Sequence, residues 1–286
     1  MYYGFVGIAV VMFGLQFLAN EQYQKETGSG FFQANLYSLL GCIFSLPILL
    51  LINGFQFEYT HFTLFMACVN CFNALLFSIC TLKALEKVNL SVFSLLSMLG
   101  GMILPLLAGI LFFSEKMTIG IALCVLFIFV ALIFTVEKDA KGEKGAFVYY
   151  VGVFVCNGMS GVISKIYADA PYLKVSNAGY SILTTLVAAI VSLTFILILW
   201  NKKPKISNKA ILFGVVSGPL LRGANYLLLI ALSVLPASIN YPMVTGGTIV
   251  VSTLLSYFTE KKPNKKEWIA VVLSFSGILF LTLLPV

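Results

Sequence analysis

Arg222 is the residue whose type and position point most directly to chemistry. It lies one or two residues from the middle of an apolar run over residues 210–232. A charged side chain at the centre of a bilayer costs about 2.5 kcal/mol or more, so it faces a partner or an aqueous cavity. No Asp or Glu lies near the middle of any apolar run. We therefore predict that the guanidinium binds a carboxylate or phosphate of a solute. The alternative is a structural arginine that is bonded to helix ends and Asn side chains.

Further polar side chains accompany this arginine at helical spacing. Asn225 and Tyr226 follow it at i+3 and i+4 and share its helix face. Asn and Ser side chains also form stripes in two other apolar runs, 62–83 and 146–167. The alternative for each Asn is a hydrogen bond between helices, worth about 0.6 kcal/mol on average. The residues predicted to bind substrate are Arg222, Asn225, Tyr226, Asn70, Asn73, Asn157, Ser160, Ser164, Gln16 and Tyr241.

Two other groups could carry chemistry. Lys165 lies near the outer edge of its run, so we expect it to snorkel to the membrane interface; the alternative is a second cationic contact at the outer mouth. Gly158-Met-Ser160-Gly161 matches the G-x-S-G pattern of rhomboid-type proteases. Such a serine needs a base, and the only histidine, His61, starts a different run. An intramembrane enzyme is therefore the disfavoured alternative.

The composition describes the elements that must position these residues. Of the 286 residues, 60% are hydrophobic and only 10% are charged, whereas soluble domains are about 25% charged. The net charge of +7 does not indicate nucleic acid, because the basic residues lie in short clusters between apolar runs. All six cysteines fall inside such runs, and we interpret Cys68 and Cys71 as apolar fillers one turn apart. We expect no metal centre and no cofactor.

Ten apolar runs are long enough to span a membrane as helices. They do not alternate as barrel strands would, so we predict an all-α membrane protein with both termini on one side. Lysines in the connections after the odd-numbered runs number 14, against 3 on the other side. This bias predicts that the lysine-rich side is cytoplasmic and that both termini are outside. The predicted spans are 2–20, 31–52, 62–83, 89–113, 118–136, 146–167, 176–200, 210–232, 237–258 and 268–285.

The sequence also contains an internal repeat. Phe113-Ser114-Glu115-Lys116 returns as Phe258-Thr259-Glu260-Lys261, and Gly100-Gly101 returns as Gly246-Gly247. These matches lie 145 and 146 residues apart. An odd number of helices per copy inverts the second copy, so we predict two inverted five-helix units, 1–139 and 140–286, around a central cavity. Both glycine pairs and Pro105 are predicted to form close-packed, bendable helix contacts used in gating; static packing is the alternative.

These motifs resemble the drug/metabolite transporter superfamily, EamA-like branch. The segments that carry the resemblance are 95–105 with Ser114-Glu115 in the first copy and 237–247 in the second. The second copy is also similar to the last helices of small multidrug resistance proteins. Those proteins carry a buried Glu in their first helix, whereas residues 2–19 contain no acid. Many ten-helix members keep their termini in the cytoplasm, which is the reverse of the lysine prediction.

The resemblance implies a secondary transporter that works by alternating access. Combined with Arg222 and the lack of buried acids, it predicts a small anionic or zwitterionic solute, such as an amino acid or organic acid. The alternatives are an intramembrane enzyme and an exporter of cationic drugs. We expect a lipid bilayer and a small solute as partners, no nucleic acid, and a monomer or homodimer in the cytoplasmic membrane.

Overall fold

The computed structural model describes residues 2–28, 30–85, 90–135, 147–200, 206–256 and 264–284. Within these ranges the regular structure is helical. Ten helices correspond in order to the ten predicted spans. They are α1 (Tyr2–Thr27), α2 (Phe31–Ile52), α3 (His61–Leu85), α4 (Leu90–Phe112), α5 (Ile119–Thr135), α6 (Phe147–Asp169), α7 (Asn177–Ile198), α8 (Asn208–Leu232), α9 (Ala237–Ser256) and α10 (Lys265–Leu283).

Polar residues determine where several helices begin and end. The Ser176 and Ser207 hydroxyls each accept a backbone N–H in the first turn of α7 and α8. Asn264 forms a capping box with Glu267 at the start of α10. The first helix continues past the predicted end at residue 20, where Glu21 and Lys25 form an i,i+4 ion pair at 3.0 Å. Pairs at this spacing support an exposed helical turn.

Counted over the described residues, seven helices are long and apolar enough to cross a membrane: α1, α2, α3, α6, α7, α8 and α10. Residues 96–112 of α4 and 119–134 of α5 are shorter apolar helices. The α9 helix belongs to neither group, because its first half carries Ser238, Asn240, Tyr241 and Pro242. All four are buried, since α9 packs against α1, α4 and α10. The polar part of α9 is thus covered by protein.

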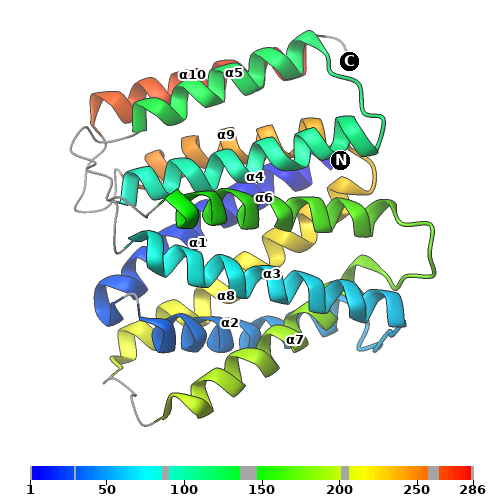
Figure 1. Ribbon diagram of the computed structural model, residues 1–286, viewed down its shortest axis with the longest axis vertical. Helices are drawn as coiled ribbons and strands as arrows, with labels where there is room; N and C mark the ends of the chain where they lie inside the picture. Colours follow the sequence, from blue (N-terminus) through cyan, green and yellow to red (C-terminus); the bar gives the residue numbers. More distant parts are fainter. Residues whose placement is uncertain are drawn as a thin grey trace.

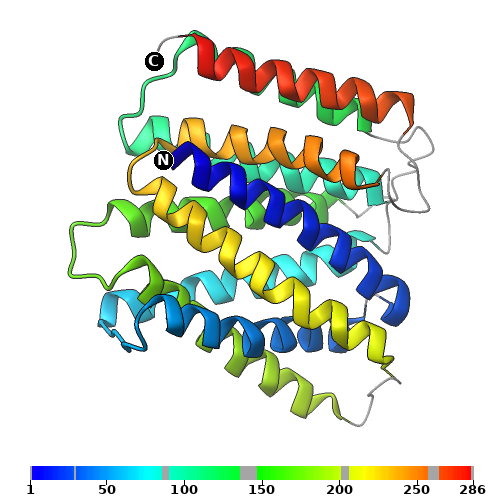
Figure 2. The same cartoon turned by 180° about the vertical axis from the view of Figure 1, so that it is seen from behind.

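The helices form two layers (Figures 1 and 2). The front layer of Figure 1 holds α3, α4, α5, α6 and α7, and the layer that faces the viewer in Figure 2 holds α1, α2, α8, α9 and α10. Within the layers α6 packs on α3 and α4, and α1 packs on α8 and α9. Between them the largest contacts are α2 with α7, α4 with α9, and α5 with α10.

The helix contacts exchange between the two halves of the chain. If five is added to each helix number from α1 to α5 and subtracted from each number from α6 to α10, the α1–α8 contact becomes the α6–α3 contact and α1–α9 becomes α6–α4. The three main contacts between layers convert into themselves. The second copy of the motif, Phe258 to Lys261, lies outside the described residues.

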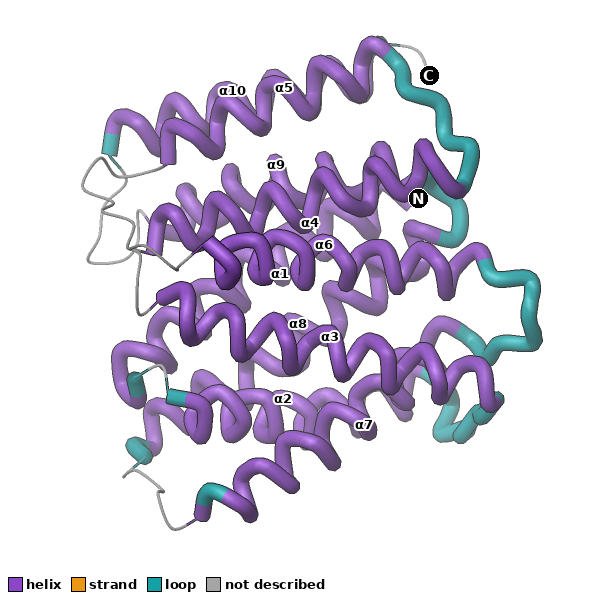
Figure 3. The backbone as a smooth tube through the Cα atoms, viewed as in Figure 1, coloured by secondary structure: helices purple, strands orange, loops and turns teal. Residues whose placement is uncertain are grey.

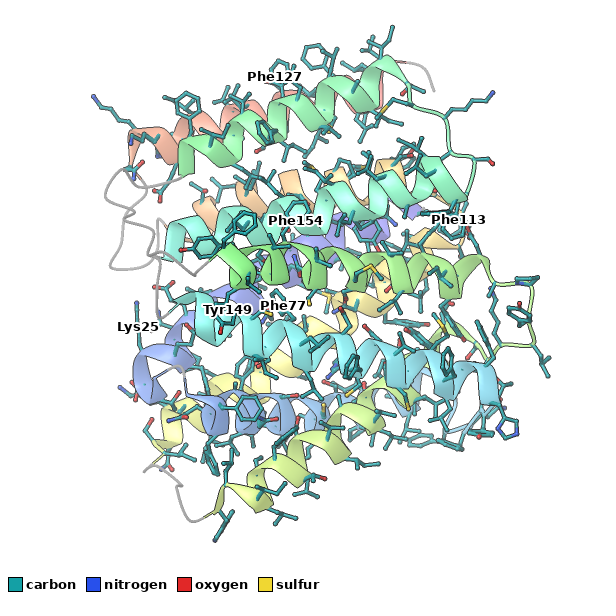
Figure 4. The ribbon with its side chains drawn as sticks, in the orientation of Figure 1. Lys25, Phe77, Phe113, Phe127, Tyr149 and Phe154 are labelled. Carbon is teal, nitrogen blue, oxygen red and sulfur yellow. The ribbon has the colours of Figure 1, made fainter. Side chains whose placement is uncertain are left out.

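The two ends of the helices differ in their loops. We call the end at which α2, α4, α6 and α8 finish the lysine-poor end. Its loops, 53–60, 113–118, 170–176 and 233–236, are drawn in teal in Figure 3. Both chain termini lie at this end (Figure 1), as predicted from the even number of helices. The opposite end, marked by Lys25 in Figure 4, is the lysine-rich end.

Small residues lie where helices cross most closely. A Cβ built on Gly41 of α2 would lie 2.9 Å from the Cα of Gly218 in α8, which is closer than real Cβ contacts. The α2–α8 crossing therefore needs glycine on both sides. The residues predicted for helix packing lie at similar contacts: Gly100 against Phe154, Gly101 against Asn157, Gly246 against Ile128, Gly247 against Val10, and Pro105 against Gly161.

Candidate functional site

Arg222 lies half-buried in α8, and the described part of the chain places no carboxylate against it. Its Nη2 donates a hydrogen bond to the Cys42 thiol of α2 at 3.2 Å. Among the described residues, no Asp or Glu lies within ion-pair distance of the guanidinium. A thiol is a weak acceptor. Most of the donor capacity of this arginine is therefore not used by strong protein acceptors in the described part of the chain.

Three other helices bring polar groups to this arginine or near it. Its charge acts on the thiol of Cys71 in α3, which also interacts with Cys42. Asn70, the residue before Cys71, lies beside the Tyr180 hydroxyl of α7. That hydroxyl is buried and lacks a hydrogen-bond partner of good geometry among the described residues. Buried polar groups normally have partners, and Asn70 is the polar side chain beside it that can supply one.

Sequence reasoning missed Cys42, Cys71 and Tyr180 in this cluster. Cys71 was interpreted as an apolar filler and Cys42 was given no role, because an apolar run gives no sign of which thiol meets an arginine on another helix. Tyr180 lies in the first turns of α7 and has no neighbouring motif. The usable signal was depth in the membrane, since Cys42, Cys71 and Arg222 all lie near the middle of their helices.

The exposure of α8 shows which side of this cluster is open. Asn225 is exposed, and it donates to the Leu221 carbonyl of its own helix at 2.8 Å. Val216, nine positions earlier, is also exposed and lies about 180° around the helix from Asn225. We take the side of Val216 as the outer face of α8 and the side of Asn225 as its inner face. One turn later Leu229 is buried, at 3% exposure. The inner face of α8 is thus open at Asn225 and sealed at Leu229, toward the lysine-poor end. Tyr226 is half-buried beside it.

Aromatic side chains seal the interior at the lysine-poor end. Leu229 packs in a cluster with Met66, Ile163, Tyr167 and Tyr180 from α3, α6 and α7. The Tyr167 and Tyr180 rings stack with centroids 3.9 Å apart. A second cluster joins α8 to the start of α9, includes Tyr241 and packs against Ala168 of α6 in the other layer. Both clusters join the two layers and close this end of the interior.

Several predicted site residues form hydrogen bonds that connect helices. Asn73 donates to the Cys156 carbonyl at 2.8 Å, which joins α3 to α6. Asn157 donates to the Ser97 carbonyl at 2.6 Å and joins α6 to α4. Gln16 donates to the Tyr37 hydroxyl at 3.2 Å, between α1 and α2. The side-chain amides of these residues are therefore at least partly occupied by the protein.

Three further predicted residues belong to α6 or contact it. Ser164 donates to the Ser160 carbonyl at 3.0 Å within that helix. Tyr241 of α9 is buried and donates to the Gly161 carbonyl at 2.9 Å. Tyr241 is therefore a contact between the two layers at the lysine-poor end.

The expectation for Lys165 is wrong. Its side chain does not snorkel to the interface but is only 7% exposed, with Nζ 3.0 Å from Glu115 and 2.9 Å from Asp169. The ring centroid of Phe113, labelled in Figure 4, lies 5.4 Å from the same nitrogen. The reason is that the loop after α4 brings a carboxylate back over α6. A buried ammonium that is paired twice has no need to reach water.

Glu115 belongs to a folded-back loop that sequence reasoning did not assign to a site. Ser114 has a positive φ of 55°, and the Glu115 N–H bonds to the Gly109 carbonyl at 3.1 Å. The carboxylate accepts the N–H groups of Ala237 and Ser238, each at 2.8 Å. Burial raises the pKa of Glu115, but these hydrogen bonds and Lys165 outweigh it and hold the pKa below its usual value. The sequence signal was the repeated Ser/Thr-Glu after a helix.

The arrangement does not support the protease alternative. Ser160 lies nine residues before the end of α6, and its carbonyl accepts Ser164. His61 is exposed at the start of α3, where its Nδ1 lies 2.9 Å from the Tyr59 hydroxyl. Nine residues of helix span about 13 Å. His61 instead lines a surface cavity of about 500 Å³ at the lysine-poor end, together with Tyr59, Thr60, Phe62, Tyr172 and Leu173.

Comparisons with known proteins give a fold match over the whole chain and a family match over part of it. A solved structure described only as the crystal structure of a protein is similar to this chain, with a TM-score of 0.75 over 98% of both chains. Its sequence identity is 17%, so this likeness shows the fold alone. A search of curated proteins found no match. The EamA-like transporter family matches residues 144–283. Residues 144–283 therefore belong to the EamA-like transporter family, which implies a multi-pass membrane transporter.

Proposed function

We propose that the protein is a secondary transporter of a small anionic or zwitterionic organic solute, such as an amino acid or organic acid. Two inverted five-helix units, 1–139 and 140–286, surround an interior site that is reached alternately from each side. The helix contacts that exchange between the halves support this arrangement. The closed lysine-poor end and the exposed Asn225 support a state that is open toward the lysine-rich end.

The observation that carries the solute class is the environment of Arg222. The guanidinium has five N–H donors, and its one described acceptor is the Cys42 thiol. A permanent charge in this position needs a counter-charge or water, and no described carboxylate supplies it. A solute carboxylate or phosphate fits the planar fork with two parallel hydrogen bonds.

The residues around Arg222 divide into solute contacts and structural links according to their hydrogen-bond partners. Asn225 and Tyr226 share its helix face, and Asn70 lies beside the unpartnered Tyr180 hydroxyl. These groups offer oxygen acceptors that suit the ammonium group of a zwitterion. Asn73, Asn157, Gln16 and Tyr241 are engaged between helices. We propose that they shape the interior and that Arg222, Asn225, Tyr226 and Asn70 contact the solute.

Uptake by proteoliposomes tests this proposal. The full chain is reconstituted and offered labelled amino acids, organic acids, organic phosphates and organic cations. We expect saturable uptake of at least one anion or zwitterion, and Arg222→Gln lowers it about 10- to 100-fold, because a charged hydrogen-bonded contact is worth about 1.5–3 kcal/mol. Lys209→Gln removes an exposed positive charge near the start of the same helix and is the matched control. Uptake of cations alone, or equal uptake by Arg222→Gln, contradicts the proposal.

We also propose that the lysine-rich end is cytoplasmic and that one chain suffices for transport. The lysine bias of 14 against 3 supports the orientation. The two halves supply both members of the inverted pair, which supports the monomer. Labelling of Ser233→Cys, an exposed position in the α8–α9 loop, in intact cells tests the orientation. A reagent that does not cross membranes labels it from outside if the orientation is right.

A further inference from the structure

We propose that Glu115 is the residue that holds the transport path closed at the lysine-poor end, by binding the start of α9 across the two layers. This inference rests on the proposed transport function. The carboxylate belongs to the loop that follows α4 in one layer, and its partners Ala237 and Ser238 begin α9 in the other. Glu115 is therefore a positioning residue for transport.

The contact is specific to the first turn of α9. Each carboxylate oxygen accepts one backbone N–H, from Ala237 to Oε1 and from Ser238 to Oε2, both at 2.8 Å. The N–H groups in the first turn of a helix have no partner within it, and the helix dipole favours a negative charge there. Ser114, with its positive φ, turns the chain so that Glu115 points back toward α9. The loop is thus folded to present this carboxylate.

Lys165 and Asp169 hold Glu115 in place. Lys165 Nζ lies 3.0 Å from Oε1, and its second ion pair with Asp169 lies within α6. Both Lys165 and Glu115 have side chains that are only 7% exposed. The charged and titratable groups that face Glu115 are Lys165, with Asp169 behind it, and the Tyr241 hydroxyl of α9. When α9 moves away, Lys165 keeps Asp169 while the carboxylate loses its two N–H donors.

A second hydrogen bond joins the start of α9 to the other layer. The Tyr241 hydroxyl, one turn into α9, donates to the Gly161 carbonyl of α6 at 2.9 Å. Gly161 packs directly against the Tyr241 ring, with a built Cβ only 2.8 Å from its Cζ. Opening this end must therefore separate α9 from the α4–α5 loop and from α6 together. Glu115 contributes the charged part of this contact and Tyr241 the neutral part.

The accessibility of an interior cysteine tests the proposal without measuring transport. Asn225→Cys lies on the exposed part of the inner face of α8. A thiol reagent that does not cross membranes is applied from the lysine-poor side, identified by labelling of Ser233→Cys, and the labelling of the chain without the added cysteine is subtracted. Intact cells and inside-out vesicles supply the two sides.

Glu115→Gln is expected to raise the rate of labelling from the lysine-poor side about tenfold, which corresponds to about 1.4 kcal/mol. Tyr241→Phe raises it less, because a neutral hydrogen bond is weaker than a charged one. Glu267→Gln is the matched control: Glu267 also accepts the backbone N–H of a residue at a helix start, Asn264 at 2.7 Å, but at the lysine-rich end. Its labelling from the lysine-poor side is expected to match the parent.

Two results overturn the proposal. If Glu115→Gln and Tyr241→Phe lower the melting temperature but leave the labelling rate unchanged, Glu115 is only a static helix cap. If Glu267→Gln increases labelling equally, the effect is a general loss of structure. The assay needs no solute, so a failed uptake experiment with a positive labelling result rejects the solute proposal and leaves the closing contact intact.

Discussion

Lys165→Met should destabilise the protein far more than the loss of a surface lysine. Lys165 carries the only buried positive charge with two carboxylate partners in the described part of the chain. Methionine keeps the length and apolar character of the stem and removes the ammonium group. The carboxylates of Glu115 and Asp169 then remain, one buried at 7% exposure and one at 34%.

The expected loss follows from these partners. Removing one member of a buried ion pair costs about 3–5 kcal/mol when the other charge is left uncompensated. Glu115 keeps two N–H donors and Asp169 is partly exposed, so we expect a smaller loss of about 2–3 kcal/mol in the free energy of unfolding. For a chain of this size this lowers the melting temperature by about 4–12 °C.

The assay is the melting temperature of the purified full chain in detergent. Lys25→Met is the control, because Lys25 pairs with Glu21 at 42% and 41% exposure and such pairs contribute about 0.5 kcal/mol or less. The Lys165→Met/Glu115→Gln double variant should lose about 1 kcal/mol less stability than the sum of the losses in the two single variants, since the residues are in contact. Equal melting temperatures for Lys165→Met and Lys25→Met would refute the burial argument.

Three further predictions concern packing, pH and affinity. Gly218→Ala should cost about 1–3 kcal/mol of stability, because the added Cβ meets the backbone of α2, whereas Gly7→Ala, with open space around it, should be neutral or stabilising; melting temperatures decide between them. The Ser176 backbone N–H donates to Glu58 and holds the pKa of that carboxyl below its usual 4.5. The contact therefore stabilises the fold fully above pH 4.5, and this stabilisation is lost as the pH falls through the lower pKa of the folded state. Glu58→Gln should remove this acid dependence of the melting temperature, and an unchanged pH profile contradicts the assignment. Asn225→Ala should raise the KM for uptake about three- to tenfold with unchanged kcat, as expected for one lost hydrogen bond; a change in kcat alone argues against direct contact.

The helices could be predicted from the sequence because each apolar run is long and ends in polar residues. The boundaries were less certain where polar residues continue a helix, as Glu21 and Lys25 do at the end of α1. The position of Arg222 and its lack of a nearby acid also followed from counting charges. A count reveals an unpaired charge, but it does not identify the Cys42 thiol that meets it.

Tertiary contacts account for what the sequence left out. Glu115 lies fifty residues before Lys165 and more than a hundred before Ala237 and Ser238, and its loop brings the four together. A lysine near the end of a helix looks like an interfacial residue until that loop is placed. The same holds for Asn73, whose amide is bound by a backbone carbonyl of α6. Helical spacing gives the face of such a residue but not its partner.

The binding of anions by Arg222 is the central claim, and thermal stabilisation by added solutes tests it most directly. The purified parent chain and Arg222→Gln are melted with carboxylates, phosphates, amino acids and organic cations. We predict that at least one anionic or zwitterionic class raises the melting temperature of the parent and leaves that of Arg222→Gln unchanged, since a ligand stabilises only the state that it binds. Stabilisation by cations alone, or an equal shift in both chains, would contradict the account.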